Sequence, residues 1–262
     1  MKISLIQSDI AWNAPGENVE RCRELAREAL AQGGDLFAFP EMFTCGFSLP
    51  TGELAQESCR QGRSFLEEIA RANRCFTLGS TPEVAPDGQI YNTAWLYRPD
   101  GSFESYRKVH LFSYGDETHR YSAGDAVLTT EIAGVRCTIF ICYDLRFTMP
   151  FFAKAAETDL FIIIANWPAP RREHWLTLLR ARAIEYQCFV AGINRVGSGG
   201  GLEYSGDSAL FGPDGAPLLQ MGSAELVATA EVDPGKVASW REVFPALRDR
   251  RAEIYGSMRS SE

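Results

Sequence analysis

Residues 86–101 read PDGQIYNTAWLYRPDG, in which two copies of Pro-Asp-Gly enclose a strand-like run. Proline suits the second position of a tight turn, and glycine supplies the positive φ that such turns need. A third copy occupies residues 213–215, again between strand-like segments. The three copies therefore predict β-hairpins, so a sheet of parallel strands alone is excluded.

Around these hairpins, segments with strand and helix patterns alternate along the chain. In the N-terminal part, we expect a strand at 3–6, a helix at 19–29 that ends before Gly33, a strand at 35–39, a helix at 65–72 that follows a polar stretch at 48–61, and a strand at 75–80. Further along, we expect strands at 126–132, 135–141, 159–165, 188–195, 204–211 and 225–232, and helices at 148–157 and 172–186.

This mixture of hairpins and strand–helix units does not fit one parallel sheet with a helix in every crossover. It favours an α/β fold with two sheets packed face to face and helices outside, which is a four-layer α-β-β-α sandwich. The sequence contains no linker or low-complexity segment. We therefore expect one domain spanning residues 1–262.

Composition narrows the possible partners. Of 262 residues, 45% are hydrophobic and 23% charged, as in ordinary globular proteins. The formal net charge of −8 disfavours nucleic acid and anionic membranes as partners, because Lys and Arg drive such binding. No signal peptide or membrane-spanning run is recognisable. The seven cysteines are scattered, odd in number and without CxxC spacing, which predicts reduced thiols in a cytoplasmic protein.

Three strand-like segments end in a reactive side chain. They are DLFAFPE ending at Glu41, SFESYRK ending at Lys108 and VRCTIFIC ending at Cys142. Ligands in open α/β sheets lie beyond the carboxyl ends of strands, so these three groups are expected to meet in one crevice. Each alone has an ordinary structural explanation: a capping carboxylate, a solvated lysine and a small buried thiol.

Together the three groups suit nucleophilic catalysis. Cys142 follows a strand at an elbow, which presents the thiol to a ligand, and Glu41 is the candidate base. Reference pKa values of about 8.5 for cysteine and about 4.3 for glutamate leave a gap of about 4 units, which burial and a nearby ammonium would narrow. Lys108 and the backbone amide of Tyr143 would hold the oxyanion. His110 remains an alternative base.

The segments FPEMFTCGF at 39–47, YRKVHLF at 106–112 and ICYDLRF at 141–147 resemble the nitrilase, or carbon–nitrogen hydrolase, superfamily. The segments ANWPAPRREHW at 165–175 and RARAIEYQ at 180–187, with NRVG at 194–197, look most like its ω-amidase branch. The resemblance implies a four-layer sandwich and a Glu-Lys-Cys triad. It also implies hydrolysis of 2-oxoglutaramate and related monoamides of dicarboxylic acids.

Carried onto this chain, the resemblance implies that Cys142 forms a thioester, with ammonia released and water completing the reaction. A second glutamate supports the triad in this family, and Glu117 matches it. No metal or organic cofactor is implied, and the partner is a small amide. Phe43, Asn166 and Trp167 are expected to form the pocket wall.

A substrate with a distal carboxylate needs a cation, because guanidinium grips a carboxylate with two hydrogen bonds. The candidates are Arg146, Arg171, Arg172 and Arg195. The sequence does not choose among them, and Arg146 is equally placed for an ion pair with Asp144, which is the role we expect of it.

Other functions remain open at this stage. Within the same family, the chain could be an N-carbamoyl amino-acid hydrolase, a nitrilase or another aliphatic amidase. A metal-dependent phosphodiesterase shares the sandwich fold but needs a late histidine, and none follows His174. An inactive binding scaffold is the third alternative. Members of the family commonly dimerise, so the resemblance implies a homodimer or a higher homo-oligomer, and the helix at 172–186 is either a dimer seam or part of the core.

Overall fold

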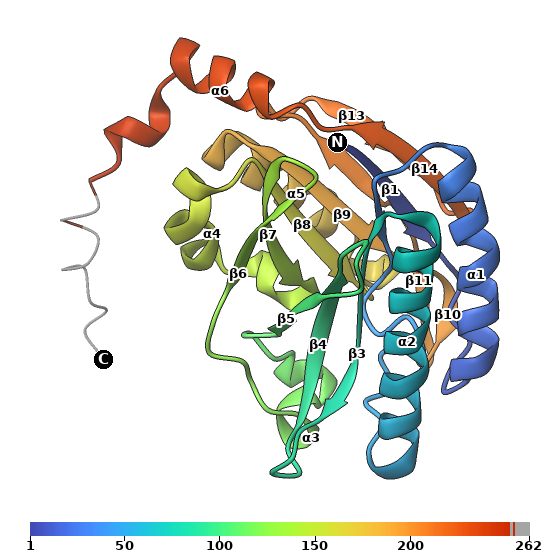
Figure 1. Ribbon diagram of the computed structural model, residues 1–262. Coiled ribbons are helices and arrows are strands. Elements are labelled where there is room, and N and C mark those ends of the chain that lie inside the picture. The colour runs from blue at the N-terminus through green and yellow to red at the C-terminus, as the bar shows by residue number, and fades with distance from the viewer. Residues whose placement is uncertain (252–253, 255–262) are drawn as a thin grey trace.

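The computed structural model describes residues 1–251 and 254. Within them, two six-stranded sheets form the framework (Figure 1). The first sheet consists of β1 (Lys2–Gln7), β2 (Leu36–Ala38), β3 (Phe76–Val84), β4 (Ile90–Tyr97), β5 (Phe103–Arg107) and β14 (Leu226–Glu231). Its strand order is β14-β1-β2-β3-β4-β5, in which β1, β2 and β3 are parallel and the other pairs are antiparallel.

The second sheet repeats this plan. It consists of β6 (Leu128–Ile132), β7 (Val135–Ile141), β8 (Leu160–Ala165), β9 (Phe189–Asn194), β12 (Ala209–Phe211) and β13 (Pro217–Gln220). The order is β13-β12-β9-β8-β7-β6, with β7, β8 and β9 parallel and the outer pairs antiparallel. A separate hairpin joins β10 (Val196–Gly199) and β11 (Leu202–Ser205).

Helices cover the outer faces of both sheets. In chain order, the helices are α1 (Pro15–Ala31), α2 (Gly52–Asn73), α3 (Glu117–Arg120), α4 (Thr148–Lys154), α5 (Arg172–Tyr186) and α6 (Pro234–Val243). Of these, α1 and α2 pack on the first sheet and α5 on the second. In Figure 1, α1 and α2 lie on one side of the molecule and α4 on the opposite side. The buried residues of α1 recur at helical spacing and pack with α2 on the first sheet. The predicted α-β-β-α sandwich is confirmed.

The Pro-Asp-Gly turns lie where the sequence places them. They connect β3 to β4, β4 to β5 and β12 to β13, and all three pairs are antiparallel. Gly101 has a φ of 83°, a conformation that favours glycine. The hairpin prediction is therefore confirmed.

Two of the expected elements differ most clearly from the structure. Helix α2 begins at Gly52, so most of the polar stretch 48–61 is helical, because its polar residues occupy the exposed face of a long amphipathic helix. The single strand predicted at 204–211 is two strands, β11 and β12, in different sheets. Gly206 and Asp207 between them have φ values of 69° and 58°, and this left-handed backbone ends the first strand.

Strand direction explains how distant segments reach one site. Strands β2 and β5 run in the same direction, because β2 is parallel to β3 and two antiparallel pairings separate β3 from β5. In the second sheet, the parallel strands β7 and β8 also end side by side. Glu41, Lys108, Cys142 and Asn166 lie in the loops that follow these four strands.

Two further points concern the chain as a whole. None of the helices within the described residues is long and apolar enough to cross a bilayer. The predicted domain extends to residue 262, and its positions 252–253 and 255–262 lie outside the described residues.

Candidate active site

Glu41 and Lys108 meet in the interior between the two sheets. Both side chains are fully buried, and Lys108 Nζ donates to Glu41 Oε1 at 3.0 Å. The other carboxylate oxygen, Oε2, accepts from the backbone N–H of Asn166 at 2.8 Å. Cys142 lines the same pocket as Lys108, and its Sγ lies 4.0 Å from the backbone oxygen of Asn166. The carboxylate, ammonium and thiol singled out in the sequence therefore gather in one place.

Glu117 adds a second buried carboxylate. Lys108 Nζ donates to its Oε1 at 3.1 Å and to its Oε2 at 2.9 Å. The backbone N–H of Phe112 also donates to Oε2, at 2.7 Å. This side chain is fixed by a short helix, α3, which begins at Glu117 itself. The lysine thus lies between two carboxylates.

Sequence reasoning missed Asn92. This fully buried residue of β4 donates from Nδ2 to Glu41 Oε1 at 2.8 Å and to Glu117 Oε1 at 3.4 Å. Its only signal in the sequence is an amide inside a strand that is otherwise mostly apolar, which does not reveal what it faces. We name Glu41, Asn92, Lys108 and Glu117 the carboxylate cluster.

The charged groups at this site shift one another's pKa values. Burial lowers the pKa of Lys108, but the charges of Glu117 and Glu41 outweigh burial and hold its pKa above the usual value, so it is an ammonium. Burial raises the pKa of the Glu117 carboxyl, and the facing charge of Lys108 offsets this only in part. Burial and then the charge of Glu41 hold the pKa of the Cys142 thiol well above its usual value, against the opposing effect of Lys108. The thiol is therefore protonated at neutral pH.

Cys142 lies at a sharp elbow. Its φ is 46°, in the left-handed region, at the point where β7 passes into a 3₁₀ turn over Cys142–Arg146. Such a backbone is strained for a residue with a side chain and is typical of functional sites. The elbow presents the thiol to the pocket beyond the end of the strand.

Asp144 links the elbow to the segment that carries Lys108. Its Oδ1 accepts from His110 N–H at 2.9 Å and lies 2.8 Å from His110 Nδ1. Its Oδ2 accepts from Tyr106 Oη at 2.7 Å and from Ile141 N–H at 3.0 Å. Because Tyr106 and His110 flank Lys108 while Ile141 precedes the thiol, this carboxylate ties the two sheets together at the site.

The contacts of His110, the alternative base, are made with Asp144 and Phe147. The Nδ1 atom of His110 is engaged by Asp144, and its ring stacks on Phe147 with centroids 4.0 Å apart. His110 does not line the pocket that holds Cys142.

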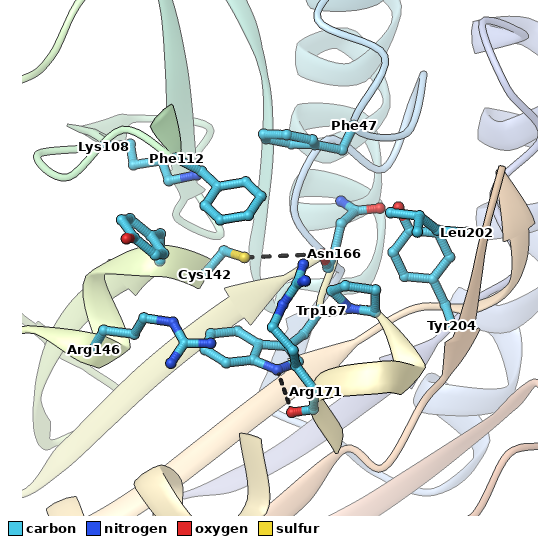
Figure 2. Close-up of a pocket in the computed structure, with 12 residues that line it drawn as sticks. Phe47, Lys108, Phe112, Cys142, Arg146, Asn166, Trp167, Arg171, Leu202 and Tyr204 are labelled. Atoms are coloured by element: carbon cyan, nitrogen blue, oxygen red, sulfur yellow. Dashed lines mark hydrogen bonds between the residues drawn. The ribbon is translucent and has the colours of Figure 1, made fainter. Parts of the chain in front are cut away.

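Figure 2 shows the pocket above Cys142. Counted out to its open mouth, and so including space open to solvent, the pocket has a volume of about 420 Å³. Tyr143, Asn166 and Trp167 line it, as the sequence analysis expects of Asn166 and Trp167. The remaining lining residues are Phe47, Lys108, Phe112, Cys142, Arg146, Pro168, Arg171, Leu202 and Tyr204.

Phe43 does not line the pocket, contrary to expectation. It is fully buried in the core beneath α2, with its ring centroid 5.5 Å from that of Phe39 and 5.9 Å from that of Phe65. The pocket wall uses Phe47 instead. The backbone is left-handed at Met42, just before Phe43, with a φ of 47°, and at Gly46, just before Phe47, with a φ of 69°.

The four candidate arginines have different surroundings, and only two of them line the pocket. Arg172 is paired with Asp207, with both hydrogen bonds at 2.8 Å, and does not line the pocket. Arg195 is fully buried and donates to Asp9 and to three backbone oxygens. Arg146 and Arg171 line the pocket, and we name these two residues the arginine wall.

Arg146 does not pair with Asp144, contrary to expectation, because that carboxylate is already occupied by the donors described above. Its guanidinium instead lies over the Trp167 ring, 4.7 Å from the centroid. Arg171 lies over the Phe112 ring at 5.4 Å. Among the described residues, neither arginine has a carboxylate within ion-pair distance, so both are available to an anion.

The described residues contain no group of His, Cys, Asp and Glu side chains that could hold a metal ion. The donor set at the site fits this result, because the ammonium of Lys108 occupies the position between the two carboxylates.

Comparison with known proteins identifies the family. The sequence profile of the carbon–nitrogen hydrolases matches residues 2–242. The chain belongs to the carbon–nitrogen hydrolase family. A 2-oxoglutaramate amidase of Bacillus subtilis is 36% identical to it over 258 residues, which cover 97% of this chain and 98% of the relative. An omega-amidase of Escherichia coli K12 is 38% identical over 254 residues, covering 95% and 96%.

Solved structures of carbon–nitrogen hydrolases resemble this one closely. A protein from Xanthomonas campestris with an arsenic adduct in its active site has a TM-score of 0.86 and 34% identity, with 96% of this chain and 97% of that chain covered. A glutamate-to-glutamine variant of an amidase from Nesterenkonia, with acrylamide added to the active-site cysteine, has a TM-score of 0.87 and 27% identity, covering 98% and 99%. Both the sequence resemblance and the fold prediction are confirmed.

Proposed function

We propose that this chain is an ω-amidase, which hydrolyses the terminal amide of short dicarboxylic acid monoamides such as 2-oxoglutaramate and succinamate. The observation that carries the proposal is the buried carboxylate cluster beside Cys142, at the base of a pocket whose wall holds two arginines that have no carboxylate partner within the described part of the chain. The names of the B. subtilis and E. coli relatives support the same substrate class.

The first half-reaction forms a thioester. Because the pKa of the Cys142 thiol is raised by burial, the thiol needs a base as it attacks, and Glu41 takes its proton while sulfur bonds to the amide carbon. The carbonyl oxygen becomes an anion, which the ammonium of Lys108 and the backbone amide of Tyr143 stabilise. Glu41 then returns the proton to nitrogen, the carbon–nitrogen bond breaks, and ammonia leaves.

The second half-reaction releases the acid. Glu41 takes a proton from water, the oxygen attacks the thioester carbon, and the same groups hold the second oxyanion. When the carbon–sulfur bond breaks, Glu41 returns the proton to Cys142. Glu117 keeps Lys108 charged and in place throughout, and none of these steps calls on a metal or cofactor.

The pocket wall selects the substrate. Tyr143, Asn166 and Trp167 contact the short carbon chain, and the arginine wall binds the distal carboxylate. Guanidinium groups suit this task because they bind a carboxylate through two parallel hydrogen bonds. A neutral amide of the same length would lack this interaction.

Ammonia release tests the proposal. We expect purified protein to release ammonia from 2-oxoglutaramate and succinamate, and the Cys142→Ala variant to release none. Glutamine and N-carbamoyl-β-alanine are the comparison substrates. Preference for N-carbamoyl-β-alanine would assign the chain to the carbamoyl hydrolases instead, and ammonia release by Cys142→Ala would contradict the mechanism.

We further propose that residues 1–262 form one domain, and that the protein is a cytoplasmic homodimer. The free state of all seven cysteines supports a reducing compartment. On α5, which is the helix expected as a dimer seam or part of the core, Trp175 and Leu179 are buried in the core. The exposed Val243 and Phe244 at the end of α6 are better placed for an interface, which light scattering of the purified protein tests.

A further inference from the structure

Asn92 contacts all three charged members of the carboxylate cluster. Its side-chain Nδ2 donates to Glu41 Oε1 at 2.8 Å and, at the longer distance of 3.4 Å, to Glu117 Oε1. Its backbone oxygen accepts from the backbone N–H of Lys108 at 2.9 Å. A single residue of β4 therefore fixes the chain at Lys108 and faces both carboxylates.

The chemistry of the neighbours determines which way the amide of Asn92 points. Ionised carboxylates only accept hydrogen bonds, so the amide nitrogen has to face them. With the amide reversed, its oxygen would lie against two carboxylate oxygens and repel both. Asn92 is thus a donor to the cluster, and a neutral one.

The two carboxylate oxygens of Glu41 therefore accept different numbers of hydrogen bonds. Oε1 accepts from Lys108 Nζ at 3.0 Å and from Asn92 Nδ2, so both of its lone pairs are used. Oε2 accepts one hydrogen bond, from the backbone of Asn166. One lone pair of Oε2 is left for a proton.

We propose that Asn92 is a positioning residue for the general base: together with Lys108 it occupies Oε1 of Glu41, so that Oε2 is the oxygen that takes and returns the proton. The inference rests on the proposed function. In the acylation step, the proton moves from Cys142 Sγ to Oε2 as the sulfur–carbon bond forms, and from Oε2 to nitrogen as ammonia leaves.

Charge balance explains why a neutral donor suits this position. The cluster already has one ammonium and two carboxylates, and a second cation next to Glu41 would hold it ionised too strongly to accept a proton. A hydrogen bond from an amide stabilises the ionised form without adding a charge. Removing it leaves Oε1 of Glu41 with Lys108 as its remaining donor and weakens the stabilisation of the ionised form.

Two other groups near Glu41 do not titrate near neutral pH. Burial raises the pKa of Cys45 and of Tyr204 to about 12, so both are neutral at pH 7. The titratable groups that face Glu41 are Lys108, Glu117, Cys142, Cys45 and Tyr204. Because Asn92 donates most closely to Glu41, its removal acts mainly on the proton affinity of that base.

The test follows alkylation of Cys142 by iodoacetamide over pH 5 to 9, measured by intact mass. In this reaction sulfur bonds to carbon, iodide leaves and Glu41 takes the thiol proton. We expect Asn92→Leu, which keeps the shape and removes the donor, to slow alkylation at pH 6 by about 10- to 100-fold, the range for a hydrogen bond to a charged group. The acidic limb of the pH–rate profile for alkylation should shift to higher pH by about one pH unit or more.

A second variant and a control make the result decisive. Asn92→Asp retains the size but adds a third carboxylate, so it should shift the limb in the same direction. Asn18→Leu is the matched control, since Asn18 is also buried and hydrogen-bonded, but its partners are backbone groups of Ala11 and Thr44 and not carboxylates. It should lower the melting temperature and leave the limb in place.

A wild-type rate profile in both Asn92 variants, with only their melting temperatures lowered, would overturn the proposal. Failure of the ω-amidase assignment is a separate result, because it would appear as absent ammonia release by wild-type protein from 2-oxoglutaramate. The alkylation comparison does not depend on that substrate.

Discussion

The carboxylate cluster at the base of the pocket and the arginine wall beside it are built in opposite ways. Glu41, Lys108 and Glu117 are fully buried and hydrogen-bonded to one another, whereas Arg146 and Arg171 are half-buried and lie on aromatic rings without a carboxylate partner among the described residues. Buried ion pairs tolerate the loss of a partner poorly, and exposed charges tolerate it well. Substitutions in the cluster should therefore change kcat, and those in the wall should change KM and substrate choice.

The largest effect is expected at Glu41. Glu41→Gln keeps the shape but removes the base, so kcat for 2-oxoglutaramate should fall at least about 10²-fold, the lower range for a positioned acid–base group. Alkylation of Cys142 in this variant should be slow at pH 7 and rise with pH, because burial still holds the pKa of the thiol high. A rate within threefold of wild type would show that another group takes the proton.

Glu117→Gln should have the next largest effect. The variant leaves Lys108 with one carboxylate partner, so we expect kcat to fall about 10-fold with little change in KM. Removing one partner from a buried ion pair costs about 3–5 kcal/mol, so the melting temperature should also fall. Kinetics and thermal unfolding measured on one preparation test both expectations, and an unchanged kcat would exclude a role for Glu117 in the reaction.

Changes in the arginine wall should be smaller and selective. Arg146→Gln and Arg171→Gln should raise KM for succinamate about 10-fold while leaving neutral butyramide unaffected, since only succinamate has a distal carboxylate. The variant with the larger effect identifies the anchoring arginine. Arg172→Gln is the matched control, because Arg172 is paired with Asp207 outside the pocket. Equal losses on both substrates would contradict carboxylate recognition.

The smallest effect concerns thiols outside both regions. Burial raises the pKa of Cys22 and Cys45 to about 12 from a usual value of 9.0. The pKa of each thiol is higher in the folded than in the unfolded protein, so keeping the thiol protonated contributes to the free energy of unfolding. This contribution is fully present below pH 9 and is lost as the pH rises toward 12. Each thiol should contribute about 1.4 kcal/mol per pH unit in that window. Thermal unfolding at pH 8, 9 and 10 measures the slope, which should decrease in Cys22→Ala.

Local patterns were enough to predict the architecture. The Pro-Asp-Gly turns and the alternation of strands with helices are properties of short segments, and they specify both hairpins and sandwich layers. The gathering of Glu41, Lys108 and Cys142 could be anticipated for the same reason, because each ends a strand and strand ends share an edge.

Residues whose direction depends on distant contacts could not be predicted. Phe43 and Phe47 lie in one loop, and left-handed backbone between them decides which one reaches the pocket. Arg146 was assigned to Asp144 because the two are close in sequence, yet Tyr106 and other donors from elsewhere in the chain already occupy that carboxylate. Asn92 was missed because one amide in a strand does not show what it faces.

The most direct test of the account is to trap the covalent intermediate. Wild-type protein mixed with 2-oxoglutaramate and quenched in acid during turnover should contain an acyl group on the peptide that includes Cys142, with one equivalent of ammonia released per acyl group formed. Peptide mass spectrometry measures the first quantity and an enzymatic ammonia assay the second. Ammonia release without any acylated Cys142, or continued release by the Cys142→Ala variant, would contradict the proposed thioester chemistry.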